Sequence, residues 1–119
     1  MTARMIGWTL SPLLALGLTL GASGLARGEE IKIGVLAPLT GPASSWGEYT
    51  RDAAELAVAE INATGGVTGV GPMKLIYEDS EGNPKAGVTA VTKLVDRHKV
   101  HVVLGEALSS VTLPAMAVT

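Results

Sequence analysis

The chain has 119 residues, 47% of them hydrophobic, and its formal net charge is −2 at pH 7. A mildly acidic chain with 3% aromatic residues lacks the clustered positive charge and the stacking side chains that nucleic-acid binding requires. Cysteine is absent, which excludes disulfide bonds, thiolate metal sites and lipid attachment through an N-terminal cysteine.

Residues 1–28 have the pattern of a secretory signal peptide. Arg4 supplies an early positive charge, residues 10–20 form an apolar run, and small residues follow. The run is about half the ~20 residues that a membrane-spanning helix needs, which disfavours the alternative of a retained membrane anchor. Small side chains at Gly24 and Ala26, or at Ala26 and Gly28, suit the peptidase. Cleavage after Ala26 and cleavage after Gly28 therefore both stay open.

Export without a lipid anchor predicts a free, soluble protein in the periplasm of a Gram-negative cell. Removal of Arg4 and Arg27 with the signal peptide leaves seven basic residues against eleven acidic ones, a net charge of −4. That charge also disfavours nucleic acid as a partner.

The exported part alternates between strand and helix patterns. Residues 31–37 are β-branched and apolar, which predicts a strand buried on both faces, and residues 38–47 are rich in Pro, Gly and Ser, which predicts a loop. A helix is expected at about residues 48–62, with an apolar stripe at helical spacing, and Gly65-Gly66 should end it.

The second half repeats this alternation. Residues 73–79 form a second predicted strand, and Asn83 followed by Pro84 predicts the start of a helix that continues to about residue 98. Residues 100–105 form a third predicted strand, and a third helix is expected from Ser110 to the last residues. Such alternation predicts an α/β fold with a parallel sheet, helices on both faces and ligand-binding loops at the carboxyl edge. A unit of three strands is thin, so we expect this chain to be a piece of a longer protein.

Two loops carry candidate binding residues. Trp46, at the end of the first loop, is a possible apolar wall beside a ligand, or an ordinary packing residue over the helix end. Ser109 and Ser110 follow the third strand, and their hydroxyl and N–H groups at a helix start could hold a carboxylate, although one of them could instead be a simple helix cap.

The other polar residues do not indicate a metal site, a cofactor site or a catalytic site. The acidic run Glu78, Asp79 and Glu81 lacks the ordered spacing of a calcium loop and is interpreted as a solvated strand end. His98 and His101 straddle an element boundary, so we predict no metal site. No nucleophile or dinucleotide motif is present in a suitable context, and we expect no cofactor and no enzymatic activity.

The order of motifs resembles the start of the leucine/isoleucine/valine-binding protein family, the periplasmic substrate-binding proteins of branched-chain amino-acid ABC transporters. The resemblance spans residues 31–119, and its elements occur in the family's order. They are Ile33-Gly34-Val35-Leu36-Ala37-Pro38-Leu39-Thr40-Gly41-Pro42, Trp46-Gly47, Ala59 to Val67 with its Ile-Asn-x-x-Gly-Gly helix end, Tyr77-Glu78-Asp79, Asn83-Pro84-Lys85-Ala86, and Val103-Leu104-Gly105 before Ser109-Ser110.

This resemblance implies a type I periplasmic-binding-protein fold, whose two lobes close over a ligand without catalysing a reaction. Residues 29–119 would be the N-terminal part of lobe 1, and the remaining contacts, including the acidic group that meets the ligand ammonium, would lie beyond Thr119. By analogy with the family, Ser109 would hold the α-carboxylate, Ser110 would be a weaker contact, and Trp46 would line the side-chain pocket. The implied partners are a small-molecule ligand and the membrane permease subunits of an ABC transporter.

Glu106 departs from the family pattern, because relatives often have small or polar residues just before the serines. The departure leaves the ligand open among branched-chain amino acids and similar small carboxylates or amides. A ligand-sensing domain of a receptor or regulator with the same fold is the alternative function. The oligomeric state is not indicated by the sequence.

Overall fold

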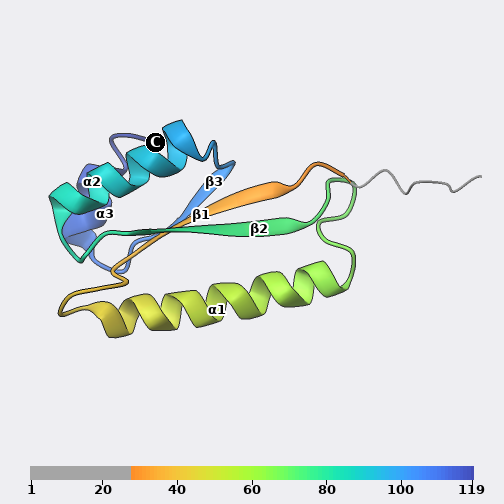
Figure 1. Ribbon diagram of the computed structural model, residues 1–119, viewed down its shortest axis with the longest axis horizontal. Helices are drawn as coiled ribbons and strands as arrows, with labels where there is room; N and C mark the ends of the chain where they lie inside the picture. Colours follow the sequence, from red (N-terminus) through yellow and green to blue (C-terminus); the bar gives the residue numbers. More distant parts are fainter. Residues whose placement is uncertain (1–27) are drawn as a thin grey trace, which may run out of the picture.

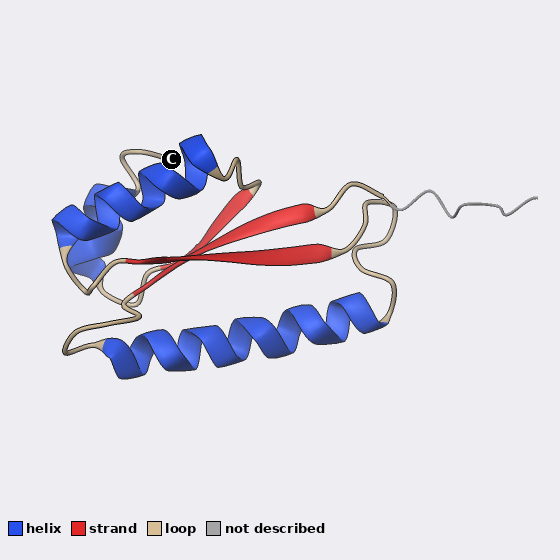
Figure 2. Ribbon diagram, viewed as in Figure 1, coloured by secondary structure: helices blue, strands red, loops and turns tan. Residues whose placement is uncertain are grey.

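The computed structural model describes residues 28–119, which form a layered α/β unit (Figures 1 and 2). The predicted signal peptide lies almost wholly outside the described residues. The elements in chain order are β1 (Ile31–Ala37), α1 (Ser44–Ala63), β2 (Met73–Asp79), α2 (Pro84–Thr92), the π-helical turn η1 (Lys93–Arg97), β3 (Val102–Gly105) and α3 (Ser109–Ala115).

The sheet is parallel, with the strand order β2-β1-β3. Val35 in the central strand β1 lies opposite Tyr77 of β2 and Leu104 of β3. Val35 is 0% exposed and Leu36 is 2% exposed. The predicted parallel sheet with a central strand buried on both faces is therefore confirmed.

Helices cover both faces of this sheet, with α1 on one side and α2 and α3 on the other (Figure 1). The core between the sheet and the helix pair α2/α3 centres on Leu94, which is fully buried. Buried residues around it come from β1 and both helices: Leu36, Ala90, Val91 and Ala115. The chain runs from β1 to β2 through α1, and then from β2 past β1 to β3 through α2. Because crossovers between parallel strands are right-handed, these two connections in opposite directions place α1 and α2 on opposite faces of the sheet.

Helix α1 begins at Ser44, four residues before the predicted start, so Trp46 lies in its first turn and not in a loop. The cause is local winding, because Ser44 N–H donates to the Gly41 carbonyl at 3.1 Å and Trp46 N–H donates to the Ala43 carbonyl at 3.0 Å. Pro, Gly and Ser are typical both of loops and of the starts of helices. The prediction of a loop through residue 47 was therefore wrong for residues 44–47, which form the first turn of α1.

The end of α1 is as predicted and explains the Ile-Asn-x-x-Gly-Gly motif. Gly66 N–H donates to the Ile61 carbonyl and Gly65 N–H to the Asn62 carbonyl, which is the Schellman arrangement, with Gly65 at φ 100°. The Asn62 side chain then both donates to and accepts from the backbone of Met73 at 2.8 Å, at the start of β2. This motif therefore ends the helix and aligns the next strand.

The second helix starts as predicted, because the Asn83 side chain accepts from Lys85 N–H and Ala86 N–H before Pro84 begins the first turn. The predicted single helix to residue 98 instead changes to π-helical winding at Lys93. Strand β3 begins at Val102, two residues later than predicted, since Val100 packs against the helix core.

Candidate functional site

The carboxyl ends of the three strands lie together at one edge of the sheet, where the chain leaves β1 and β3 in opposite directions (Figure 1). After β1 it enters α1 on one face, and after β3 it enters α3 on the other. Such a topological switch point leaves a crevice outside the sheet edge, which is where open α/β folds bind ligands. Trp46 lies in the first turn of α1 and Ser109 is the first residue of α3, so both candidate residues lie at this edge of the sheet.

Trp46 presents a largely free aromatic face. Its side chain is 59% exposed, and its ring meets that of Tyr49 edge to face, with centroids 6.4 Å apart. Tyr49 is 66% exposed and was not predicted as a site residue, although its spacing of three from Trp46 on a helix places both on one face. The two rings form an aromatic wall.

This aromatic wall borders an open groove of about 590 Å³ between α1 and the end of β3. The volume is within the range of small-molecule sites. Its lining is mainly apolar and includes one carboxylate side chain, that of Glu106: Trp46, Tyr49, Thr50, Ala53, Ala54, Ala57, Leu104, Gly105, Glu106 and Ala107. We call it the α1–β3 groove.

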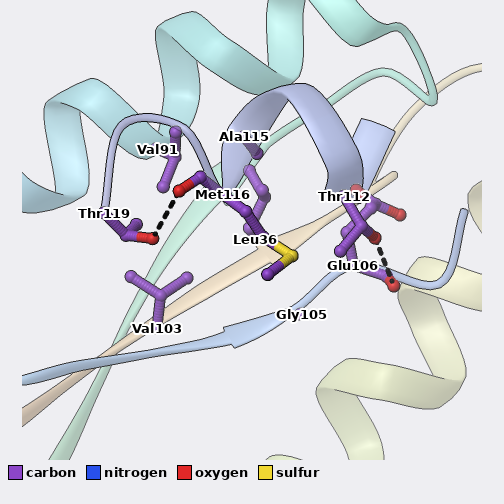
Figure 3. A pocket seen from close by; sticks show the side chains of 9 residues that line it. All are labelled: Leu36, Val91, Val103, Gly105, Glu106, Thr112, Ala115, Met116 and Thr119. Carbon is purple, nitrogen blue, oxygen red and sulfur yellow. Dashed lines mark hydrogen bonds between the residues drawn. The ribbon is translucent and has the colours of Figure 1, made fainter. Parts of the chain in front are cut away.

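A second, much smaller cavity of about 90 Å³ lies on the other face of the sheet, under α3 (Figure 3). Leu36, Val91, Val103 and Met116 make most of its wall apolar. It is too small for an amino acid. Glu106 and Gly105 border both this cavity and the α1–β3 groove, so the segment after β3 separates the two.

Ser109 is the first residue of α3, one residue before the predicted helix start, and Ser110 follows it. The helix cap is Leu108, whose side chain makes no capping hydrogen bond, so the interpretation of either serine as a simple N-cap is wrong. Both serines are exposed. They share the sheet edge with Trp46 but do not line the α1–β3 groove, so the described residues do not bring all three into one cavity.

Gly105 turns the chain from β3 toward α3. Its φ is 144°, and a Cβ atom there would lie 2.1 Å from the Leu36 carbonyl oxygen, so only glycine fits. Glu106 follows, and its Oε1 accepts from Ala107 N–H at 2.9 Å and Leu108 N–H at 3.3 Å. The loop before Ser109 is therefore held by its own carboxylate.

Asp79 was predicted to be part of a solvated strand end. Its side chain instead joins the loop after β1 to the loop after β2. Its carboxylate accepts from Leu39 N–H (2.8 Å), Thr40 N–H (3.3 Å), the Thr40 hydroxyl (2.6 Å) and Glu81 N–H (2.7 Å). Burial alone would raise the pKa of Asp79, but these hydrogen bonds outweigh burial and hold the pKa below its ordinary value. We call this arrangement the Asp79 clamp.

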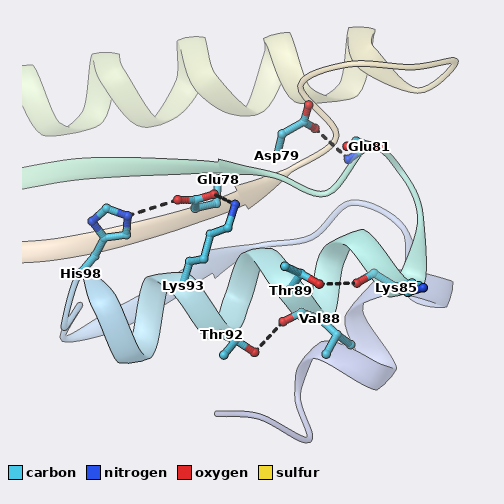
Figure 4. Close-up of polar contacts among 9 residues, drawn as sticks. All are labelled: Glu78, Asp79, Glu81, Lys85, Val88, Thr89, Thr92, Lys93 and His98. Atoms are coloured by element: carbon cyan, nitrogen blue, oxygen red, sulfur yellow. Dashed lines mark hydrogen bonds and ion pairs between the residues drawn. The ribbon is translucent and has the colours of Figure 1, made fainter.

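The side chains of the neighbouring acidic residues Glu78 and Glu81 do not take part in the Asp79 clamp (Figure 4). Glu78 pairs with Lys93 at 3.3 Å and with His98 at 3.1 Å, while Glu81 is exposed. His101 lies apart, where its Nδ1 accepts from Lys32 N–H at 3.0 Å. Within residues 28–119 no three His, Cys, Asp or Glu side chains gather as a metal site would require, and no helix there is long and apolar enough to cross a membrane.

The family described as periplasmic binding protein matches residues 30–119. The Leu/Ile/Val-binding protein BraC3 of Rhizobium johnstonii is 40% identical over 87 residues, which are 71% of this chain and 23% of that protein. The Leu/Ile/Val-binding protein of Escherichia coli is 36% identical over 103 residues, 87% of this chain and 28% of the relative. The chain thus spans about a quarter of the length of these relatives.

A solved structure gives the same picture of the fold. The branched-chain amino-acid transporter substrate-binding protein LivJ of Streptococcus pneumoniae, in complex with isoleucine, superimposes with a TM-score of 0.71 at 34% identity. The alignment covers 75% of this chain and 25% of LivJ. The parallel sheet with flanking helices therefore corresponds to part of the fold of that protein.

Proposed function

The chain belongs to the periplasmic binding protein family, and from this premise we propose that it captures a branched-chain amino acid, or a similar small carboxylate or amide, for an ABC importer. The carrying observation is the match to Leu/Ile/Val-binding proteins and to LivJ in its isoleucine complex. The protein would bind its ligand without transforming it and pass it to the membrane permease subunits. Calorimetric titration with leucine, isoleucine and valine tests this function directly.

The positions of Ser109 and Trp46 at the carboxyl edge of the sheet support different roles for the two residues in ligand binding. Ser109 would hold the ligand carboxylate by its hydroxyl and the N–H groups at the start of α3, with Ser110 beside it, and Trp46 would provide the apolar wall. Residues 29–119 would form the first part of lobe 1, and a second lobe contributed by residues beyond Thr119 would close over the ligand. We refer to that whole molecule as the two-lobed protein.

We expect residues 1–26 or 1–28 to be removed on export, leaving a protein free in the periplasm. The basic start, the short apolar run and the small residues after it support this expectation. N-terminal sequencing of the periplasmic fraction should find a first residue at Arg27 or Glu29. A protein that still starts at Met1 and sediments with membranes would contradict it.

Trp46 should report on ligand binding by its fluorescence. The side chain is 59% exposed in the α1–β3 groove, so a ligand or a closing lobe would exclude water from the indole ring. Titration of the two-lobed protein with leucine should shift its emission, and Trp46→Phe should remove that shift. Tyr49→Phe is the matched control, because it keeps Trp46 and the aromatic wall. If the full shift persists in Trp46→Phe, Trp46 is a packing residue.

A further inference from the structure

The start of α3 packs against two glycines of the segment between β2 and α2. The Cδ1 atom of Leu108 lies 3.3 Å from the position that a Cβ atom of Gly82 would occupy. Three residues further on, Val111 packs so closely against Gly87 that a Cβ atom there would lie 2.3 Å from the Val111 Cγ1 atom. Val111 is fully buried and Leu108 is half-buried. Each glycine therefore leaves the space that one apolar side chain of this helix start fills.

The two candidate serines lie between these apolar contacts. Ser109 and Ser110 separate Leu108 from Val111 in sequence, and both serines are exposed. Residues three apart share one face of a helix, so the apolar face of this first turn meets the chain between β2 and α2 while the serines stay on the solvent side. The Leu108 carbonyl also accepts from the N–H groups of Val111 (3.0 Å) and Thr112 (2.9 Å). A shift of Leu108 would therefore shift the start of α3.

The loop that carries Gly82 is itself held in place. The Gly82 N–H donates to the hydroxyl of Ser80 at 3.2 Å, and Ser80 is fully buried. The Asp79 clamp holds the preceding turn. A Cβ atom of Gly82 would also lie 3.6 Å from that of Ala43, the residue directly before α1. The contact between Leu108 and Gly82 therefore fastens the start of α3 to the loops after β1 and β2.

We propose that Leu108 is a positioning residue for the carboxylate anchor: its side chain, packed on Gly82, holds Ser109 in place before a ligand binds. A group that is already held in position loses little freedom on binding, and this strengthens the affinity. The inference rests on the proposed function and deepens it, because it assigns part of the affinity to a side chain that does not touch the ligand.

Calorimetric titration of the two-lobed protein with leucine tests this role. Leu108→Ala should weaken binding by about 3- to 10-fold, as expected when one side chain must be ordered on binding. Leu108→Met should restore most of the affinity, because methionine has a similar volume and reaches the same space. Leu113→Ala is the matched control, since it makes the same substitution on the same helix at a side chain that is 71% exposed, and it should leave the affinity unchanged.

A double-mutant cycle with Ser109→Ala separates positioning from a general loss of structure. If Leu108 acts through Ser109, Leu108→Ala should weaken leucine binding less in the Ser109→Ala background than in the wild type. Equal fold losses in both backgrounds, or wild-type affinity of Leu108→Ala, would overturn the role of Leu108 and leave the proposed function standing. If the wild type binds none of leucine, isoleucine and valine, the proposed function is rejected, and this inference with it.

Gly82→Ala tests the same contact from the opposite side, should Leu108→Ala fail to fold. Gly69→Ala is its control, because Gly82 (φ 64°) and Gly69 (φ 77°) are both left-handed, but a Cβ atom at Gly69 would meet nothing within 4 Å. Both variants should lose stability in urea unfolding, and only Gly82→Ala should also bind leucine more weakly. Equal affinity of the two variants would overturn the positioning role.

Discussion

Replacing Ser109 by alanine in the two-lobed protein is expected to weaken amino-acid binding by about 10- to 150-fold. The substitution removes the hydroxyl that we propose donates to a ligand carboxylate. A hydrogen bond to a charged group contributes about 1.5–3 kcal/mol, and each 1.4 kcal/mol equals a factor of ten. The backbone N–H groups at the start of α3 remain, so binding should weaken and not vanish. Calorimetric titration with leucine measures the change.

Ser110→Ala is the matched control, because it removes a hydroxyl from the next residue of the same exposed helix turn and should have the smaller effect. The 119-residue chain itself should not bind measurably, since the second lobe would supply most of the contact surface. Equal affinity of wild type and Ser109→Ala would reject Ser109 as the anchor. Micromolar binding by the 119-residue chain would reject the two-lobed arrangement.

Replacing Asp79 by alanine is expected to lower the free energy of unfolding by about 3 kcal/mol and to weaken ligand binding as well. The carboxylate accepts four hydrogen bonds, and a bond to a charged group contributes about 1.5–3 kcal/mol, but bonds that share one partly exposed acceptor do not add. Without the Asp79 clamp the loop that leads to Trp46 loses its attachment to β2. Urea unfolding of the two-lobed protein measures the first effect and titration with leucine the second.

Thr40→Val is the control for the clamp, because it removes only the hydroxyl donor and should cost less than Asp79→Ala. The effect should also depend on pH. The pKa of Asp79 is lowered in the folded protein, so its stabilisation is complete above the ordinary pKa of 3.8 and is lost as pH falls through the folded value. The stability difference between wild type and Asp79→Asn should therefore be constant from pH 7 to about pH 5 and shrink below about pH 4. A difference that grows on acidification would contradict the clamp.

The strand bounds and helix ends that were predicted correctly from the sequence are those set by residues within the same few positions of the chain. β1 and β2 have the predicted bounds, because short apolar or alternating runs lie between segments rich in glycine and proline. The start of α2 was predicted correctly because Asn83 and Pro84 act within one turn. The start of α1 was not, since Ser44 and Ser45 suit a loop and a first helical turn equally.

The strand and helix pattern indicated where candidate binding residues lie, and the resemblance supplied the role expected of each. Trp46 and Ser109 were expected at the sheet edge, and the structure places both there, although not in one cavity. The Asp79 clamp was missed because its partners Leu39 and Thr40 are about 40 residues away, and no local pattern encodes such a contact. One carboxylate oxygen of Glu106 is buried without a hydrogen-bond partner among residues 28–119, and no sequence pattern predicts such an enclosure.

The position of β3 at the rim of the described sheet bears on how this chain behaves in a test tube. On that side its backbone pairs with no other strand among residues 28–119, and Val102 and Leu104 are 52% and 47% exposed. A bare strand rim with apolar side chains is a template on which a second polypeptide can add its own strand. Purified alone, the 119-residue chain should therefore aggregate by intermolecular strand addition as its concentration rises, so its ligand titrations require dilute, freshly prepared samples.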